Sequence, residues 1–355
     1  MAEARQSSEA VPVQFGKYLL DGEIARGGMS RVYRARLRGP GGFEKKLVVK
    51  QILPHLAQDP SFIELFVREA NTLVQMSHGN IVPVYELGVV DGVYFLAMEL
   101  VPGATIAEIL GDGPLPQELV AQIGVQVCEA LRYAHDRFEL VHRDVTPRNV
   151  IVDSDGHVRL LDFGIAAPLA HTGQGERFGS PGYMSPEQVG GRALSARSDL
   201  FSLGTVLYEA ATGERAIARG DEKGVPAQLS PGEALDADLC EVINDLLAVD
   251  PAARPGSARE VAARLRRWIA EHHPGGVAAR LGERAEAARA REPEQPKPEA
   301  DVEPGDTSQT PQVTRSIATS QALDAIISQA TEPLSGRAHP SPPPAASEAS
   351  GRRGG

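Results

Sequence analysis

Three side chains that can move a proton or bind a metal ion lie near one another in the sequence, at Asp144, Asn149 and Asp162. Between the last two, short apolar runs flank the turn Asp-Ser-Asp-Gly at 153–156, and this pattern predicts a β-hairpin. The hairpin would gather the three side chains around one small volume. One carboxylate there can accept a proton from an attacking hydroxyl, while the amide and the second carboxylate offer hard oxygen ligands to Mg²⁺. The segment therefore has the groups that phosphoryl transfer needs.

Two regions of different pattern must position this cluster. Residues 15–100 mostly alternate between apolar and polar side chains, which predicts a strand-rich lobe. One stretch of that lobe has helical spacing instead, and its apolar residues are Phe62, Ile63, Leu65, Phe66, Ala70, Leu73 and Val74. Residues 103–272 have helical periodicity, with apolar stripes that begin at Val120, Leu200 and Leu239. We therefore expect an α+β fold with a small antiparallel sheet lobe and a larger, mainly helical lobe.

The composition excludes several classes of protein. The 355 residues carry a net charge of −11, which argues against a general binder of nucleic acid or anionic membranes. Two cysteines are too few for a disulfide framework, and Cys128, in a helical pattern, is interpreted as a buried apolar residue. The sequence has neither an apolar run of the roughly 20 residues that a membrane span needs nor an N-terminal signal peptide. We expect a soluble, cytoplasmic protein.

Both ends of the chain differ in composition from the middle. Residues 1–14 are polar and unpatterned, as in a disordered leader, and residues 276–291 have the Ala, Arg and Glu content of a surface helix. Residues 292–355 are rich in Pro, Ser, Glu and Ala, which predicts a disordered tail. The island 317–327 in this tail is either a short helix that docks a partner protein or an apolar patch without a role.

Several motifs resemble those of protein kinases, in the order that the family has them. His142-Arg143-Asp144 with Asn149, and Asp162-Phe163-Gly164, resemble the catalytic and metal-binding motifs. Residues 25–32 resemble the glycine-rich loop Gly-x-Gly-x-x-Gly-x-Val, although Ala25 and Ser30 replace its first and third glycines. Over roughly residues 15–270 the chain is similar to bacterial eukaryotic-like (Hanks-type) serine/threonine kinases, here without a transmembrane sensor. The resemblance implies a bilobal kinase fold.

The resemblance also implies a site for ATP and Mg²⁺. Asp144 would be the catalytic base, Asn149 and Asp162 would bind the metal, and Lys50 would hold phosphates while paired with Glu69. Among the nucleotide-binding residues, Met98 would be the gatekeeper and Thr105 would contact the ribose. The full set implied for the nucleotide is Ile24, Ala25, Gly27, Gly28, Ser30, Val32, Val48, Lys50, Met98, Glu99, Val101, Thr105, Ile151 and Asp162.

The catalytic loop departs from the family at one position. Serine/threonine kinases usually carry a lysine two residues after the catalytic aspartate, where this chain has Thr146. Arg148 has the offset of the arginine that tyrosine kinases use, so it either takes over the γ-phosphate contact or is a solvated loop charge. Ser180 occupies the position whose hydroxyl touches the catalytic aspartate in serine/threonine kinases, which favours Ser and Thr as acceptors.

Other residues match structural parts of the family. Glu187 would form a buried ion pair with Arg254, and Asp199 would brace the catalytic loop. A spine linking the lobes would consist of Leu73, Val84, His142 and Phe163. In the activation segment, either Thr172 is an autophosphorylation site or Glu176 supplies fixed charge. The stretch 213–239 is shorter than in relatives that carry a substrate-docking helix there.

The leading interpretation is an autophosphorylating protein serine/threonine kinase that uses ATP and Mg²⁺ on protein substrates. The alternative is a pseudokinase, a nucleotide-sensing scaffold that recruits partners through its tail. The altered glycine loop and Thr146 favour the alternative, whereas intact Lys50, Asp144, Asn149 and Asp162 favour the enzyme.

Overall fold

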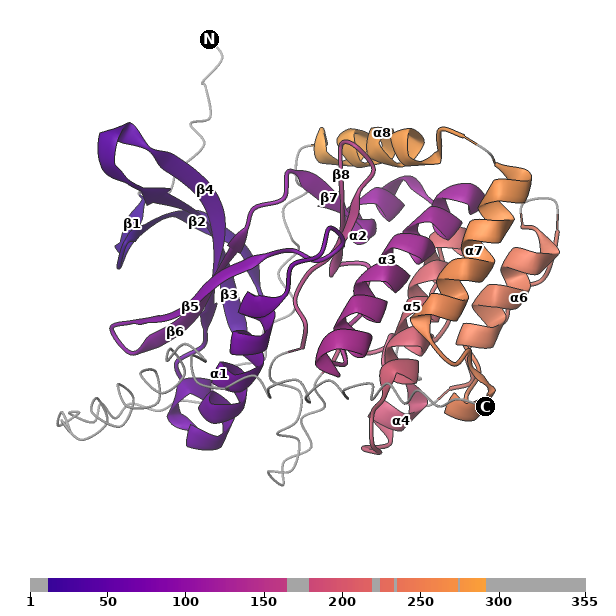
Figure 1. The fold of residues 1–355 in the computed structure, drawn as a ribbon, viewed down its shortest axis with the longest axis horizontal. Coiled ribbons are helices and arrows are strands. Elements are labelled where there is room, and N and C mark those ends of the chain that lie inside the picture. Colours follow the sequence, from indigo (N-terminus) through magenta and orange to yellow (C-terminus); the bar gives the residue numbers. More distant parts are fainter. Residues whose placement is uncertain (1–11, 165–178, 219–223, 233–234, 274, 292–355) are drawn as a thin grey trace, which may run out of the picture. The chain divides into compact units, whose positions relative to one another are not determined.

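The computed structural model describes residues 12–164, 179–218, 224–232, 235–273 and 275–291, in two lobes (Figure 1). The N-terminal lobe is a six-stranded antiparallel sheet in the order β1-β2-β3-β4-β6-β5, accompanied by one long helix. Its strands are β1 (Val13–Phe15), β2 (Tyr18–Arg26), β3 (Ser30–Arg38), β4 (Glu44–Ile52), β5 (Val84–Val90) and β6 (Val93–Glu99). The helix α1 spans Pro60–Gln75, and single 3-10 turns lie at Pro40–Gly42 and Leu56–Gln58.

The sequence explains how the strands and the helix of this lobe form. Alternate residues of the strands point into one core, where Leu47, Val49 and Ala97 are almost fully buried. Helix α1 begins at a strong N-terminal signal, because the Asp59 side chain accepts hydrogen bonds from two backbone N–H groups and Pro60 follows it. Four residues of the predicted apolar face of α1 are buried, Phe62, Phe66, Ala70 and Leu73. Ile63 and Leu65 are half-buried and Val74 is exposed, because they lie toward the edge of this face.

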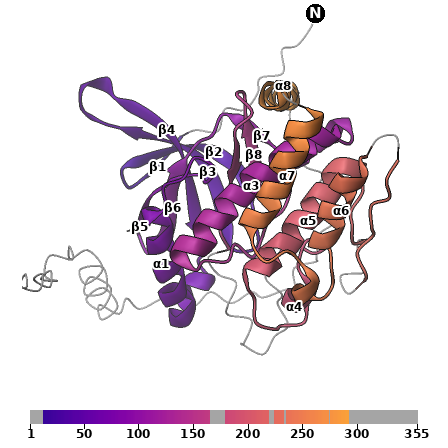
Figure 2. The same cartoon turned by 45° about the vertical axis from the view of Figure 1, so that its right-hand side comes forward.

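The C-terminal lobe is mainly helical (Figure 2). Its helices are α2 (Ile106–Ile109), α3 (Gln117–Phe138), α4 (Pro186–Val189), α5 (Ala196–Thr212), α6 (Ala237–Leu246), α7 (Ala258–His272) and α8 (Val277–Arg289), with 3-10 turns at Leu110–Asp112 and Pro251–Ala253. The long helix α3 packs against α5, α7 and α8. Helix α5 is bounded by a capping box at Ser195 and by Gly213, whose left-handed backbone ends the helix.

A small sheet lies where the two lobes meet. It contains β7 (Gly103–Thr105), β8 (Val150–Asp153) and β9 (Val158–Leu160), in that order. Strands β8 and β9 form the hairpin predicted from sequence, with Val150 opposite Leu160. Leu160 also bridges Ile81 of the N-terminal lobe, so the hairpin is tied to both lobes.

The predicted fold class is confirmed, and some details differ. Val13 and Gln14 belong to a strand that pairs with β2, although the disordered leader was expected to reach residue 14. A three-residue strand is too short to show a period in the sequence. Cys128 is fully buried, as interpreted. Between Gly213 and Asp236, the described residues form no helix.

Several predictions fall outside the described residues. They concern the leader up to residue 11, Thr172, Glu176, and the tail with its island at 317–327. Of the helices in the described part of the chain, none combines the length and apolar character that crossing a bilayer requires.

Candidate active site

One buried carboxylate anchors the catalytic loop, residues 142–149. Asp199, on α5, accepts hydrogen bonds from the backbone N–H groups of His142 and Arg143 at 2.7 and 2.8 Å. His135 of α3 contacts the same carboxylate at 2.7 Å. Asp199 is fully buried, so these contacts satisfy a charge that would otherwise be costly to bury. The start of the loop is therefore held in place, as the resemblance implied for Asp199.

Asp144 and Asn149 are joined directly. The Asn149 side-chain amide donates to the Asp144 carbonyl oxygen and to its Oδ2, both at 2.8 Å. The backbone N–H of Ser180 donates to Asp144 Oδ1 at 3.1 Å. The hydroxyl of Ser180 was expected to make this contact, and the structure shows the backbone group making it. Both oxygens of Asp144 thus have a defined orientation.

The charged pairs beside the catalytic loop differ from the expectation. Lys50, on β4, lies 2.9 Å from Asp162 Oδ1, and Glu69, on α1, lies 3.1 Å from Arg143 Nη1. The pairing of Lys50 with Glu69 is therefore not the one that these described residues adopt. Burial raises the pKa of Glu69, and the nearby Arg143 offsets part of this shift. Glu69 thus has a neighbour of opposite charge, but from the catalytic loop.

Two residues of the site have a backbone conformation that L-amino acids seldom adopt. Arg143 has φ of 69° and Asp162 has φ of 47°. Each costs on the order of 1 kcal/mol, and such strain persists where the surrounding structure enforces it. Here Asp199 fixes Arg143, and the hydrogen bond from Gly164 N–H to the His142 carbonyl oxygen, at 2.9 Å, fixes the segment after Asp162. The His142 and Phe163 rings pack with centroids 4.5 Å apart, two members of the expected spine in contact.

The residues implied for the nucleotide come from both lobes. In the glycine-rich loop, Gly27 N–H donates to the Ser30 carbonyl oxygen at 2.9 Å, which closes a turn between β2 and β3. Ile24 and Ala25 lie near the end of β2, whereas Ser30 is the first and Val32 the third residue of β3. Strand pairing places Val32 opposite Lys50, Val48 opposite Met98, and Thr105 opposite Ile151. Val48, Met98 and Val101 are buried, and Ile24 is 47% exposed. Gly28 lies in the turn that Gly27 closes, and Glu99 ends β6.

One pair at this site gave no signal in the sequence. Arg159 of β9 donates to Glu99 Oε1 at 2.7 Å, which joins the end of β6 to the hairpin that precedes Asp162. Glu99 was predicted only for its backbone, and Arg159 was not singled out. Residues 60 apart in the chain meet only after the two lobes have folded, so no local pattern could have indicated the pair.

The two departures in the catalytic loop occupy different environments. Thr146 is 3% exposed, and its carbonyl oxygen accepts a hydrogen bond from Asn149 N–H at 3.0 Å. Arg148 is exposed on the same loop, between Pro147 and Asn149. A threonine can be buried here because its hydroxyl is uncharged, whereas a lysine would need a partner. Of the two residues, only Arg148 offers a positive charge to the solvent side of the loop.

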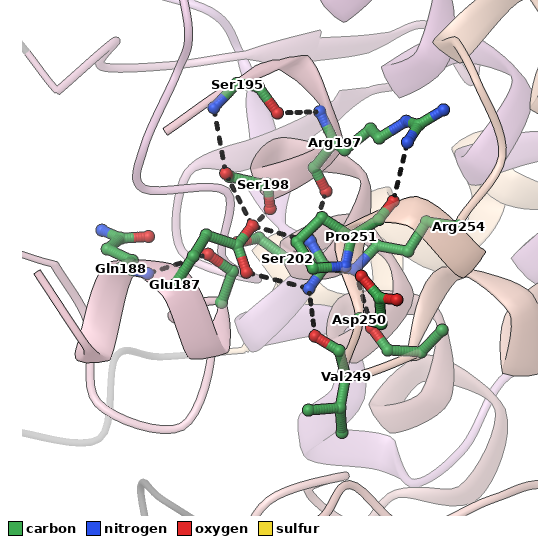
Figure 3. A network of polar contacts seen from close by, with 12 residues as sticks. Glu187, Gln188, Ser195, Arg197, Ser198, Ser202, Val249, Asp250, Pro251 and Arg254 are labelled. Carbon is green, nitrogen blue, oxygen red and sulfur yellow. Dashed lines mark hydrogen bonds and ion pairs between the residues drawn. The ribbon is translucent and has the colours of Figure 1, made fainter. Parts of the chain in front are cut away.

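A buried ion pair holds the segment that follows Ser180 (Figure 3). Arg254 donates to both oxygens of Glu187, at 2.7 and 2.9 Å, and Ser198 donates to Oε1 at 2.7 Å. The Arg254 side chain is 0% exposed and that of Glu187 is 4% exposed. Burial alone would raise the pKa of Glu187, but the hydrogen bonds from Arg254 and Ser198 outweigh it and lower the pKa to about 2. The pair fixes α4 to the body of the lobe.

This lowered pKa predicts how stability depends on pH. Between the ordinary value of 4.5 and about 2, the folded protein keeps Glu187 ionised while the unfolded chain is protonated. The stabilisation is therefore complete above pH 4.5 and is lost as the pH falls toward 2, by about 3 kcal/mol in total. Urea unfolding between pH 5 and 3 should show a smaller loss for Glu187→Gln than for the wild type. Equal losses would contradict this assignment.

The donor set at the site suits a divalent metal. Asp162 offers carboxylate oxygens, and because the Asn149 amide nitrogen is bonded to Asp144, its carbonyl oxygen is the atom that can bind a cation. Hard oxygen donors of this kind match the preference of Mg²⁺. Asn149 and Asp162 therefore fit the metal that the sequence implied, and Lys50 beside Asp162 places a positive charge where phosphates would be neutralised.

Comparisons with known proteins agree with this site. Residues 18–265 match the family model described as "Protein kinase domain". The chain is 35% identical over 294 residues to the tyrosine-protein kinase MasK of Myxococcus xanthus, covering 76% of this chain and 45% of MasK. It is also 35% identical over 269 residues to the serine/threonine-protein kinase PknB of Mycobacterium tuberculosis, covering 70% of this chain and 42% of PknB.

A solved structure gives the same result for the fold. The PknI kinase domain of Mycobacterium tuberculosis superposes with a TM-score of 0.61 and 31% identity, covering 74% of this chain and 99% of that one. A bilobal fold with a catalytic loop, a metal-binding motif and a lysine at the lobe interface defines a protein kinase. The chain belongs to the protein kinase domain family. It spans less than half the length of the curated relatives named above.

Proposed function

We propose that this protein is a kinase that transfers the γ-phosphate of Mg-ATP to Ser and Thr hydroxyls of protein substrates. The proposal rests on two contacts near the lobe interface: the Asn149 amide donates to Asp144, and Lys50 forms an ion pair with Asp162. All four groups have the types that the reaction needs, and the family match supports their roles. The pseudokinase alternative requires such a set to be inactive, although Lys50, Asp144, Asn149 and Asp162 all keep the residue types of the enzyme.

Each residue has a distinct task in this proposal. Asp144 accepts the proton of the acceptor hydroxyl while that oxygen bonds to the γ-phosphorus, and the bond from this phosphorus to the β-phosphate oxygen breaks, so that ADP leaves. Asn149 and Asp162 would hold Mg²⁺, which when bound neutralises charge on the phosphates. Lys50 contacts the α- and β-phosphates, and positive charge there stabilises the leaving group. Glu69, which here meets Arg143, would become the partner of Lys50 when the nucleotide is engaged.

The acceptor is the finer part of the proposal. PknB is named a serine/threonine kinase and MasK a tyrosine kinase, so the relatives differ. Ser180 favours Ser and Thr because it keeps a hydroxyl at the position where serine/threonine kinases carry one, and its backbone N–H donates to Asp144. The offset of Arg148, in contrast, resembles tyrosine kinases. We infer Ser/Thr because a residue with a hydroxyl lies beside Asp144 at position 180, whereas Arg148 matches tyrosine kinases only by its offset in the sequence.

One experiment tests both parts. The full chain is incubated with Mg²⁺, ATP labelled on the γ-phosphate and a basic protein, and the product is hydrolysed for phosphoamino-acid analysis. We expect phosphoserine and phosphothreonine, with no label above background in the Asp144→Asn variant. Label confined to tyrosine would refute the acceptor, and equal labelling in both proteins would refute the enzyme in favour of the scaffold.

Arg148 gives a separate prediction. If Arg148 supplies the charge that Thr146 lacks, Arg148→Ala should lower kcat by about 10- to 100-fold because transition-state charge is no longer balanced. The affinity for ATP should change less than threefold, since the other phosphate contacts remain. Steady-state kinetics with varied ATP measures both. A kcat within twofold of the wild type would assign Arg148 to the solvated loop, and Arg192→Ala, at an exposed arginine, is the control.

Some features stay as predictions on residues that the structure does not describe. These are autophosphorylation at Thr172 or fixed charge from Glu176, and a partner protein docked by the tail. We also propose that the protein works in the cytoplasm and that residues 15–272 form its kinase domain.

A further inference from the structure

Helix α8 lies beyond the part of the chain that the family model matches. The match ends at residue 265, whereas α8 spans Val277–Arg289. The sequence indicated a surface helix here. One side of α8 is exposed, and the other contacts α2, α3, β7 and β8. Figures 1 and 2 show α8 beside β7 and β8. It therefore touches the small sheet that carries part of the nucleotide site.

One face of α8 is buried against these elements. Val277, Leu281, Ala285 and Ala288 are all less than 9% exposed, and their spacing of three and four residues places them on one side of the helix. Leu281 is fully buried. Burying a leucine contributes about 2 kcal/mol, so this face is held by more than incidental contact.

The backbone of α8 approaches the turn between β8 and β9 unusually closely. A Cβ added at Gly282 would lie 2.1 Å from the Ser154 carbonyl oxygen, and one at Gly156 would lie 2.0 Å from the Ala278 carbonyl oxygen. Gly156 also has φ of +78°, which L side chains rarely adopt. The two glycines face each other's elements, so helix and turn pack backbone to backbone with no space for a methyl group.

Polar contacts fix both ends of α8. Arg280 Nη1 lies 2.7 Å from Glu118 Oε1, and Glu118 is 7% exposed at the start of α3. Just after the helix, Arg291 pairs with Asp112 in the 3-10 turn that follows α2. A buried carboxylate depends on its partner, so the contact of Arg280 with Glu118 opposes sliding of α8 along the sheet.

The turn that α8 contacts is also held from the other side. Gln126 of α3 donates to the Gly156 carbonyl oxygen at 2.9 Å and accepts from Val158 N–H at 2.9 Å. The hairpin is thus clamped between α3 and α8. Its first strand, β8, carries Ile151, and β7 beside it carries Thr105 directly opposite Ile151. Both belong to the set implied for the nucleotide, in which Thr105 would contact the ribose.

We infer that α8 is a positioning element for the nucleotide, which holds Thr105 and Ile151 by supporting β7 and β8 from behind. This inference rests on the proposed use of ATP. It assigns to a segment outside the family match a role in ATP affinity rather than in phosphoryl transfer. Displacing α8 should therefore weaken ATP binding and leave the catalytic loop, anchored by Asp199, in place.

The test uses the full chain with Gly282→Ala, and Gly275→Ala as the control. Gly275 is exposed, with nothing within 4 Å of an added Cβ. Alanine favours helix by about 1 kcal/mol over glycine, so local propensity alone predicts that Gly282→Ala is harmless. The close contact with Ser154 predicts the opposite. We expect the dissociation constant for a fluorescent ATP analogue, and the KM for ATP, to rise about fivefold while kcat stays within twofold.

A second variant decides the outcome if Gly282→Ala does not fold. Arg280→Ala should raise the same two constants about threefold, and Arg280→Lys should restore most of the loss because the positive charge is kept. Thermal unfolding of each protein identifies the folded samples. Unchanged ATP affinity in folded Gly282→Ala, or in folded Arg280→Ala where the first variant is unfolded, would overturn the inference. Because analogue binding needs no turnover, an inactive wild type that still binds would refute the proposed function alone.

Discussion

Replacing Asp144 with asparagine should reduce kcat by about 10³-fold, the size of effect that loss of a positioned general base produces. The substitution keeps the shape of the side chain and removes the basic oxygen that takes the proton. The effect should be on catalysis rather than on folding, because in the described part of the chain the Asp144 carboxylate accepts hydrogen bonds from Asn149 and from the backbone N–H of Ser180 and not from a core residue. The fold should therefore survive, and binding of an ATP analogue should change less than threefold.

Asp91→Asn is a suitable control for this experiment. Asp91 is an exposed residue in the turn between β5 and β6, with φ of 49°, a conformation that asparagine tolerates. This variant makes the same chemical change far from the catalytic loop in sequence and should keep wild-type kcat. Both rates are measured from phosphate transfer to a protein acceptor at saturating ATP. A loss of less than tenfold for Asp144→Asn would mean that another group takes the proton.

The parts of the fold that local pattern determines were predicted from sequence. Helix α1 has an apolar face at three- and four-residue spacing, and four of the seven residues selected by that spacing are buried, whereas Val74 is exposed. The hairpin of β8 and β9 follows from two apolar runs around an Asp-Gly turn. The position of Asp144 beside Asn149 needs only five residues of chain. In each case the sequence near the residue contains the cause.

Contacts between distant segments were harder to predict. A glutamate at position 69 is expected to have a positively charged neighbour, and both Lys50 and Arg143 could fill this role. The placement of α1 in the folded protein brings Glu69 to Arg143. The contact of Ser180 with Asp144 uses a backbone N–H, which every residue except proline has. The side chain at that position therefore says little about the contact.

The close packing of helix α8 was not predicted, for a related reason. Its sequence is mostly Ala, Arg and Glu, which suits an exposed helix, and its buried face consists of small side chains. Small side chains give weak hydrophobic periodicity, so the sequence favoured a surface helix. The same small residues, Gly282 above all, let the helix approach the turn at Ser154. The small side chains that weaken the hydrophobic pattern of α8 are therefore the ones that allow its close packing.

The second large effect concerns Arg254, whose replacement by alanine should lower the free energy of unfolding by about 3–5 kcal/mol. Arg254 is the sole side chain in Figure 3 that reaches both oxygens of Glu187, and it also donates to the carbonyl oxygens of Ala248 and Arg197. Among the described residues, removing it leaves the buried Glu187 carboxylate with only Ser198 as a side-chain donor, and leaves the carbonyl groups of Ala248 and Arg197 without this donor. A typical domain has only about 5–15 kcal/mol of stability in total.

Arg38→Ala is the matched control, since Arg38 pairs with Glu44 at 3.5 Å with 64% of its side chain exposed. An exposed pair contributes at most about 1 kcal/mol, so urea unfolding at pH 7 should separate the two variants clearly. Similar losses of unfolding free energy in the two variants would show that the buried pair stabilises the protein no more than an exposed pair does. The Arg254 variant should also lose activity at temperatures where it is still folded. Glu187 lies in α4, and the next residue, Gln188, donates to the carbonyl oxygen of Arg143 at 2.9 Å, so freeing α4 releases one restraint on the catalytic loop.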